Sequence, residues 1–389
     1  MSRSDEKYID QLKERYRKAR KKEKSAILDE FVKTTGYHRK HATSVLNGRR
    51  ERVQGPIQRP RRKVYGAEEA AAIRILADLF DNICSKLLRA AMNVELPRLY
   101  ASGVLQVSPQ CYEKLLRVSP STMDRLRAGH RASSKKRRGF TKPGTLLKDR
   151  IPIRTWADWT ENQPGFSEMD LVDHSGGVTI RGADHAWTLC FTDIFTAWTE
   201  CMAVPNKAQV HVFAAIQQVR QRLPFPLLGV DSDNGSEFIN DQLARYCDQE
   251  HITFTRGRSG RTNDNAHVEQ KNGAIVRRAV GYYRYDTFEQ LDLLNRLYAL
   301  MRLYGNFFLP VMKLKEKVRV GSKVTRIYDA PQTPYARVLA SPDVSDADKA
   351  ELQEAYGYLH LVSLRIQINQ LLDELLQSLS ARSDVRRRL

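Results

Sequence analysis

Three acidic residues in the middle of the sequence have the side chains and the spacing that metal-dependent phosphodiester chemistry can use. They are Asp170 in SEMDLV, Asp233 in SDNGSEF and Glu269 in NDNAHVEQKNG. Carboxylate oxygens are the ligands that hard divalent cations prefer. Two such ions about 4 Å apart can stabilise both the attacking and the leaving oxygen at one phosphorus atom. The chain can use this chemistry if its fold brings the three acids together.

Local patterns predict the elements that position these acids. Alternation places Glu168 and Asp170 on one face of a strand and apolar residues on the other. Asp233 ends the apolar segment FPLLGVDSD, a predicted buried strand, and open α/β sheets bind ligands beyond the carboxyl ends of their strands. Glu269 lies one turn into a helix predicted from 265 to 282. Adjacent strands and one helix can therefore bring the three carboxylates to one crevice.

Other acids compete for the same roles. Asp173 and Asp193 lie on neighbouring predicted strands and are alternatives for the first acid. Asp231 lies two residues before Asp233 on the same strand face and is the main alternative for the second. An Asp-Asn-Gly sequence alone is most often a turn. The Asn-Gly pair that follows Asp233 nevertheless favours Asp233 over Asp231, because the three residues belong to a longer sequence motif.

That pattern resembles the DD(35)E motif of retroviral integrases and related insertion-sequence transposases. SDNGSEF follows a buried strand, and 35 residues, 234 to 268, separate its Asp233 from Glu269. The resemblance covers roughly Arg154 to Arg284. This segment is similar to the integrase core of insertion-sequence transposases that carry helix-turn-helix units ahead of that core. It implies that Asp170, Asp233 and Glu269 are catalytic and bind two Mg²⁺ or Mn²⁺ ions. It also implies cleavage by water, followed by attack of a freed 3′-hydroxyl on target DNA.

The order of predicted elements agrees with a ribonuclease-H-like (retroviral integrase) α/β core at 151–285. Three successive strands precede any helix, and later strands alternate with helices and run parallel. The predicted strands are 165–174, 185–195, 197–204, 225–233 and 252–256, and the helices between and after them are 207–223, 237–250 and 265–282.

Composition favours a nucleic-acid partner. The 389 residues carry 64 Lys and Arg against 45 Asp and Glu, a formal charge of +19, and such a field attracts polyanions. Five widely spaced cysteines exclude a disulfide framework or a Cys-rich zinc site. No apolar run reaches the roughly 18 residues of a membrane span, and the first residues lack the apolar centre of a signal peptide. We therefore expect a cytoplasmic, nucleoid-associated protein without a membrane partner.

Ahead of the core, two all-α helix-turn-helix regions are expected at 1–52 and 65–132. In the first, a helix, a turn at 35–36 and a second helix from 37 to 46 have helix-turn-helix spacing. Its predicted core is Ala26, Ile27, Phe31, Val32, Ala42, Val45 and Leu46. In the second, helices are predicted at 68–80 and 83–93, and the segment 112–129 repeats the helix-turn-helix design, with Ser119 and Pro120 as a helix start. Two helices packed for structural reasons alone are the alternative interpretation.

Candidate DNA-contacting residues lie on the second helix of the first region, in the second region, in a basic linker at 133–150, and around Glu269. Arginine in the loop RGRSGR can bind phosphate with two hydrogen bonds. The candidates are Arg39, Lys40, Thr43, Arg125, Lys135, Lys136, Arg137, Arg138, Arg256, Arg258, Arg261, Lys271 and Arg277. A solvated loop or tether with ordinary charges is the alternative for each group.

Beyond the core, a helix and a basic extended segment are expected at 286–340, where Pro331 and Pro334 argue against regular helix. A mostly helical region at 341–389 carries an apolar stripe between 343 and 380. That stripe can pack on the core or pair with another subunit.

The resemblance implies a DNA transposase or integrase that cleaves DNA at element ends, the terminal inverted repeats, and transfers strands into target DNA. Because moving a segment requires chemistry at both of its ends, a homo-oligomer on DNA is expected. Two alternatives remain. One is a DNA-binding regulator with an inactive integrase-like core, and the other is a purely hydrolytic nuclease of the same fold.

Overall fold

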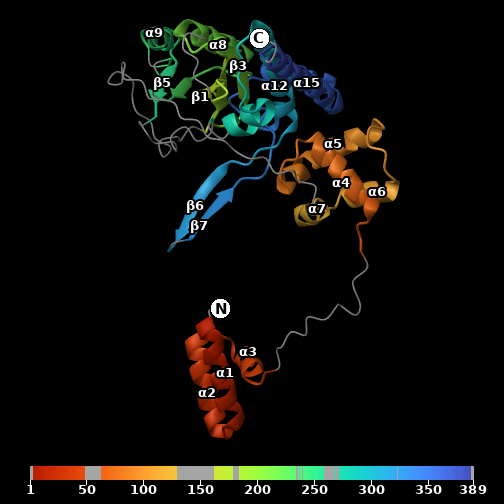
Figure 1. Ribbon diagram of the computed structural model, residues 1–389, viewed down its shortest axis with the longest axis vertical. Helices are drawn as coiled ribbons and strands as arrows, with labels where there is room; N and C mark the ends of the chain where they lie inside the picture. The colour runs from red at the N-terminus through yellow and green to blue at the C-terminus, as the bar shows by residue number, and fades with distance from the viewer. Residues whose placement is uncertain are drawn as a thin grey trace. The chain divides into compact units, whose positions relative to one another are not determined.

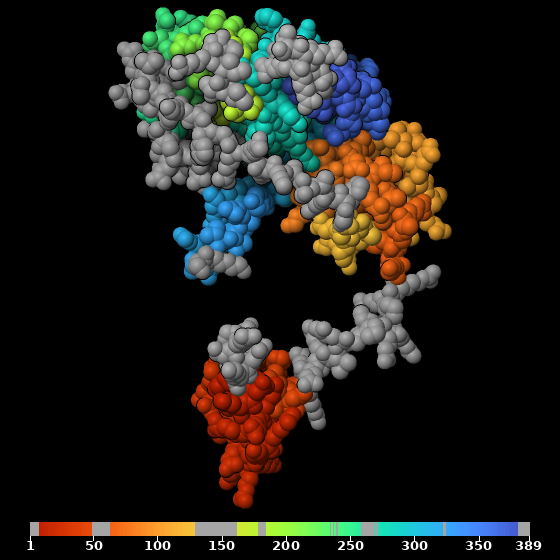
Figure 2. Space-filling model, in the orientation of Figure 1, coloured from red at the N-terminus to blue at the C-terminus, as the bar shows by residue number. Residues whose placement is uncertain are grey.

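The computed structural model describes residues 3–48, 63–128, 162–177, 184–233, 235, 237, 238, 240–257, 268, 271–321 and 323–386. The chain divides into two compact units, Met1–Val64 and Tyr65–Leu389, each with its own core (Figure 1). Figure 2 shows the same units as filled surfaces. In the described part of the chain, none of the helices has the length and apolar composition that crossing a bilayer needs.

The N-terminal unit consists of α1 (Arg3–Lys18), α2 (Lys21–Thr35) and α3 (Arg39–Leu46). Gly36 ends α2 in the left-handed conformation, φ 67°, which glycine adopts without steric cost. The predicted helix pair is therefore present, and α1, which the sequence analysis did not predict, packs against it. Ala26 was expected in the core but is exposed, because the helix turns Leu28 inward instead. The core consists of Ile9, Leu12, Tyr16, Ile27, Leu28, Phe31, Ala42 and Leu46.

The second unit begins with α4 (Ala67–Leu79), α5 (Ser85–Ala101), α6 (Pro109–Leu115) and α7 (Pro120–Leu126). Ser119 caps α7 by accepting from the Thr122 N–H at 3.3 Å, with Pro120 at the first helical position, as predicted. The prediction for α5 was too short, since that helix continues through Pro97 while Leu96 and Leu99 stay buried. These helices share one hydrophobic cluster with the C-terminal helices.

The centre of this unit is a five-stranded sheet of order β3-β2-β1-β4-β5. Its strands are β1 (Phe166–Asp173), β2 (Trp187–Asp193), β3 (Thr199–Val204), β4 (Gly229–Ser232) and β5 (Thr253–Arg256). β1, β2 and β3 are antiparallel neighbours, whereas β4 runs parallel to β1 and β5 parallel to β4. This order and these directions are those of the expected ribonuclease-H-like core.

One face of the sheet is apolar and is covered by α8 (Gln209–Arg222) and α9 (Asp241–Gln249) (Figure 1). α9 begins later than predicted because Asn240 caps it, accepting from the Leu243 N–H at 2.9 Å. The sheet residues of this core are Met169, Leu171, Leu189, Phe191 and Val230, and the helix residues include Val212, Ala215, Ile216, Val219 and Leu243.

The opposite face is covered by the π-helix η2 (Asn272–Arg277), α11 (Arg278–Val280) and α12 (Phe288–Phe308). α15 (Leu361–Arg386) packs along α12 and buries Leu364, Ile368 and Leu371. The C-terminal apolar stripe is thus used mainly for internal packing.

The segment predicted as basic and extended contains two regular elements. A hairpin of β6 (Leu314–Val320) and β7 (Lys323–Tyr328) forms a separate two-stranded sheet. α13 (Pro334–Ala340) then begins at a proline, with Thr333 as its cap, and is followed by α14 (Asp346–Tyr358). The expectation that Pro334 prevents helix was wrong, because proline is tolerated at the first helical position.

Candidate active site

The register between β1 and β4 brings two of the predicted acids together. The last paired residues of the two parallel strands are Met169 and Ser232. Asp170 and Asp233 follow them directly, one on each strand, and neighbouring strands lie about 4.8 Å apart. Glu168 is paired with Asp231 two positions earlier, so the acids of both strands share one sheet face. Two carboxylates therefore lie side by side where β4 ends.

The third predicted acid, Glu269, lies outside the described residues, but residues on both sides of it in the sequence contact β1. The backbone N–H of Val268 donates to the carboxylate of Glu168 at 2.8 Å. The side-chain amide of Asn272 donates to Oδ2 of Asp170 at 2.6 Å. The segment that carries Glu269 is thus attached to the strand that carries Asp170 at two points.

Asn272 was missed by the sequence analysis. Its signal is its position three residues after Glu269, since residues three apart on a helix share a face. Residues 272–277 form a π-helix, a form that occurs often at functional sites. Asn272 thus holds Asp170 through its amide N–H, and its Oδ1 is buried without a hydrogen-bond partner among the described residues.

The surroundings of Asp233 affect its charge. Burial raises the pKa of this carboxyl, the Gly235 N–H opposes the rise by donating to Oδ1 at 2.9 Å, and the neighbouring Glu237 adds to it. A Cβ atom at position 235 would lie 2.9 Å from that same oxygen and 2.7 Å from the Glu237 carboxyl, so a side chain there would displace both acids. A positive ion at this position would favour the charged form of Asp233.

The competing acids have other contacts. Asp231 is completely buried and accepts a hydrogen bond from Thr255 on β5. Asp193 accepts from the Gly165 and Thr196 backbone N–H groups within the fold, and burial raises its pKa to about 6. Asp173 accepts from Ser175 at the end of β1. The geometry thus favours Asp170 and Asp233 over these alternatives.

The donor set fits a hard divalent cation, since the side chains that meet at this edge offer oxygen atoms. Elsewhere in the described residues, one group of three acidic or sulfur side chains, Glu68, Glu69 and Cys111, has metal-like spacing. Its two carboxylates are hydrogen-bonded in helix caps, Glu69 to the Gly66 N–H and Glu68 to Ser108. That group is therefore better explained as structural.

The candidate DNA contacts fall in different environments. In the N-terminal unit Arg39 and Lys40 are exposed, although Arg39 also pairs with Asp29. Thr43 is half-buried and donates to the Arg39 carbonyl, and Arg125 on α7 is exposed.

Near the acids, Arg256 is buried at the end of β5. Arg277 donates to the backbone carbonyls of Asp173 and Gly281. Lys271 donates to the Ala197 carbonyl at 3.4 Å and lines an internal cavity. The remaining candidates lie outside the described residues: Lys135, Lys136, Arg137, Arg138, Arg258 and Arg261.

No protein-family model matches the chain. The uncharacterized protein y4rM of Sinorhizobium fredii (strain NBRC 101917 / NGR234) is 43% identical over 333 residues, which cover 85% of this chain and 93% of y4rM.

Solved structures that resemble the chain include integrase catalytic cores. The BIV integrase core is 18% identical with a TM-score of 0.28, covering 44% of this chain and 91% of its own. The HTLV-2 integrase core in complex with magnesium, in its dimeric form, is 16% identical with a TM-score of 0.29, covering 38% of this chain and 91% of its own. The fold assignment rests on the order, direction and register of the five strands.

Proposed function

From the premise that the chain belongs to the family of the uncharacterized protein y4rM, we propose that it is a DNA transposase of the DDE type, a metal-dependent polynucleotidyl transferase. It cleaves DNA strands at the terminal inverted repeats of an element and joins the freed 3′ ends to target DNA. The observation that carries this proposal is the placement of Asp170 and Asp233 at the ends of adjacent parallel strands on one sheet face.

In this proposal Asp170, Asp233 and Glu269 hold two Mg²⁺ or Mn²⁺ ions. Such ions polarise phosphoryl oxygens and lower the pKa of bound water. The protein's own residues position the ligands. The Asn272 amide fixes the orientation of the Asp170 carboxylate, and Glu168 holds the backbone of the segment before Glu269 through the Val268 N–H. Groups that fix metal ligands in this way typically change metal affinity or activity by about 10–100-fold when removed.

Recognition of the element ends is assigned to the N-terminal unit, Met1–Val64, as a helix-turn-helix domain. Its helix α3 presents exposed Arg39 and Lys40, which suits contacts to phosphates and base edges. The chain's charge of +19 supports DNA as the partner and the cytoplasmic nucleoid as the location. A fragment of residues 1–64 is the appropriate test, because α4–α7 share their hydrophobic core with the rest of the second unit.

Two active sites must act together to move one DNA segment, so the proposed active species is a homo-oligomer that holds both ends. Mixing an Asp233→Asn protein with one lacking the N-terminal unit tests this arrangement. Partial recovery of strand transfer is expected if one subunit binds an end that another cleaves. A monomeric mass on DNA ends, together with no recovery, contradicts it.

The function itself is tested with DNA carrying the element ends and Mg²⁺ or Mn²⁺. Wild-type protein is expected to give both nicked and strand-transfer products. Products of cleavage alone indicate a hydrolytic nuclease, and end binding without any product indicates a regulator with an inactive core. Near-normal turnover by Asp170→Asn, Asp233→Asn or Glu269→Gln would exclude the assigned acids.

A further inference from the structure

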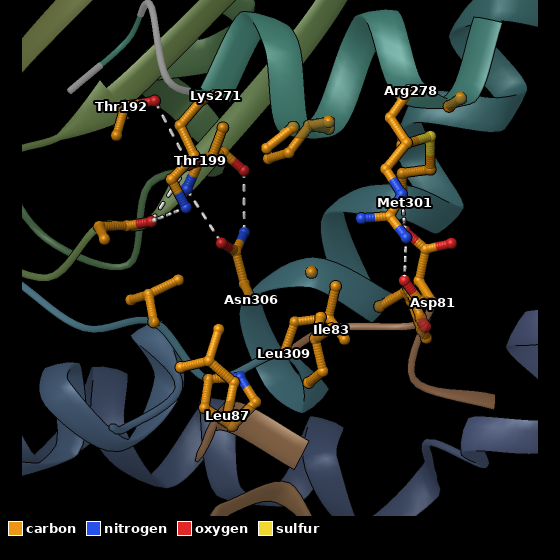
Figure 3. A pocket seen from close by; sticks show the side chains of 18 of the residues that line it. Asp81, Ile83, Leu87, Thr192, Thr199, Lys271, Arg278, Met301, Asn306 and Leu309 are labelled. Atoms are coloured by element: carbon orange, nitrogen blue, oxygen red, sulfur yellow. Dashed lines mark hydrogen bonds and ion pairs between the residues drawn. The ribbon is translucent and has the colours of Figure 1, made fainter. Parts of the chain in front are cut away.

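A cavity of about 1080 Å³ lies within the second unit, separate from the acid pair (Figure 3). Its walls come from the turn after α4, the helix that follows Glu269, α12, the root of the β6–β7 hairpin and α15. Small-molecule sites in proteins usually measure roughly 300–1,000 Å³, so the cavity is large enough for a ligand of nucleotide size. Its lining differs in character from one end to the other.

One end of the cavity is polar and positively charged. Lys271 projects into it beside Thr192, Thr199 and Asn306 (Figure 3). The Asn306 amide is held by the backbone of Thr199, since it accepts from the Thr199 N–H and donates to the Thr199 carbonyl, both at 2.9 Å. Among the described residues the Lys271 ammonium makes one hydrogen bond, the 3.4 Å contact to the Ala197 carbonyl. The Lys271 side chain is half-buried and its ammonium has three N–H donors, so this end of the cavity can bind an anion.

Cations outnumber acids around the cavity. Asp81 is its one acidic lining residue among those described, and it is paired with Arg278 at 2.9 Å and Arg365 at 3.5 Å. Lys313 adds a second ammonium, which donates to the Phe195 carbonyl at 2.6 Å. Arg326 on the hairpin is exposed and also lines the cavity. The lining therefore keeps a positive charge that its own acid does not neutralise.

The other end of the cavity is apolar. Ile83 from the turn after α4 and Leu87 on α5 lie beside Leu309 (Figure 3). Such a surface suits a flat uncharged group such as a nucleobase, whereas a phosphate alone would leave it unused.

We propose that this cavity binds a nucleoside phosphate, with the phosphate at Lys271 and Lys313 and the base against Ile83, Leu87 and Leu309. The nucleotide is either free or an unpaired nucleotide at the end of a DNA strand. Only the second source depends on the proposed function. Lys271 follows Glu269, the proposed third catalytic acid, by two residues in the sequence, so an occupant would lie close to that acid along the chain.

The first test measures binding of dAMP to the full chain by calorimetry, in EDTA so that no cleavage occurs. Deoxyadenosine and inorganic phosphate are compared, because each lacks one half of the proposed ligand. Wild-type protein is expected to bind dAMP at least about tenfold more tightly than either, as charge-assisted hydrogen bonds contribute that much. Lys271→Met, which keeps the apolar stem, is expected to remove this preference. Equal binding of dAMP and deoxyadenosine, or an unchanged preference in Lys271→Met, overturns the proposal.

A cavity-filling pair tests the location. Gly305 lines the cavity on α12, and a Cβ there meets no atom within 4 Å. Gly305→Leu should fill the space without disturbing the helix and reduce dAMP binding at least about tenfold. Gly357 on α14 also has open space but does not line the cavity, so Gly357→Leu is the matched control. Binding that survives Gly305→Leu, or is lost equally in both variants, contradicts the site.

The source is distinguished with duplexes that have either blunt ends or three unpaired nucleotides. Tighter binding of the unpaired end, abolished by Gly305→Leu, identifies a DNA strand as the occupant. Binding of dAMP without such a difference identifies a free nucleotide. If neither dAMP nor the unpaired end binds in a Gly305-dependent way, the proposal fails, whatever the outcome of the cleavage assay with the acid variants.

Discussion

The two faces of the central sheet are built from the same strands but have opposite chemistry. Residues Met169, Leu171 and Leu189 point to one face and are buried against α8 and α9. Their immediate neighbours Asp170 and Cys190 point to the other face and are paired with each other across β1 and β2. Strand alternation thus separates an apolar face from a face on which the candidate acids lie beside residues of a second hydrophobic core, such as Val172 and Cys190.

This difference explains why the acids can lie close together. Two adjacent carboxylates repel each other and are costly to desolvate. Burial of the apolar side chains on the other face of the same strands offsets this cost in free energy. The polar face also contains the cysteines and threonines that line the nucleotide-sized cavity, Thr192, Thr199 and Cys201. Substitutions on the two faces should therefore have opposite consequences for activity and stability.

The largest effect is expected on the polar face. Asp170→Asn or Asp233→Asn should lower DNA cleavage by about 1000-fold or more, since loss of metal-based charge stabilisation removes several kcal/mol. Asp233→Asn should not lower the stability of the folded state, because burial already disfavours the charged form of Asp233. Product formation in gels and thermal melting measure the two effects. If an acid variant lost stability but kept normal turnover, the assignment of the chemistry to this face would be contradicted.

The complementary change is Leu189→Ala on the apolar face, where Leu189 is completely buried. It should lower the free energy of unfolding by about 2–5 kcal/mol, as large-to-small core substitutions do. Denaturant titration measures this loss, and cleavage per folded molecule should remain normal at low temperature. Cys190→Ala, the adjacent residue on the other face, is the control and should cost less. A loss below about 1 kcal/mol for Leu189→Ala would contradict its assignment to the core.

A smaller effect is expected from Asn272→Ala. Removing its 2.6 Å hydrogen bond should raise the Mg²⁺ concentration needed for half-maximal cleavage by about 10–100-fold, with little change in folding. Asn206→Ala is the control, since it removes a half-buried Asn that donates to Asp184 and accepts from the Ala208 N–H, away from the acid pair. An unchanged Mg²⁺ requirement would mean that Asn272 does not position Asp170.

The smallest effect concerns His174, whose ring contacts Thr188 on the polar face at 2.7 Å. Burial lowers the pKa of His174 to about 3 from 6.5, so the unfolded chain binds a proton that the folded chain excludes. The contribution of neutral His174 to the free energy of unfolding is therefore complete above pH 6.5. As the pH falls from 6.5 toward 3, this free energy decreases by about 1.4 kcal/mol per pH unit. In His174→Gln the decline of unfolding free energy between pH 6 and 5 should be shallower by up to that amount. Equal slopes for the two proteins would show that His174 is protonated in the fold.

Much of the fold could be predicted because it depends on neighbouring residues. The strands β1, β2 and β3, the capped start of α7 and the faces of Glu168 and Asp170 all follow from local periodicity and capping. The helices that were predicted too short or not predicted are those whose extent depends on contacts between residues far apart in the sequence. α5 continues through Pro97 because Leu96 and Leu99 are buried by other segments, and α1 forms because it covers α2 and α3. The β6–β7 hairpin was missed because its exposed basic residues give no core-facing pattern.

The sequence by itself determined which residues can carry chemistry, how far apart they are, and on which face of a strand each acid lies, since backbone geometry sets the period of two. Only the tertiary structure decided that β4 pairs with β1 in the register that sets Asp233 beside Asp170. It also decided that Asn272 bonds an acid 102 positions earlier and that Lys271 lines a cavity. Such contacts join distant parts of the chain, and their free energy depends on how whole elements pack.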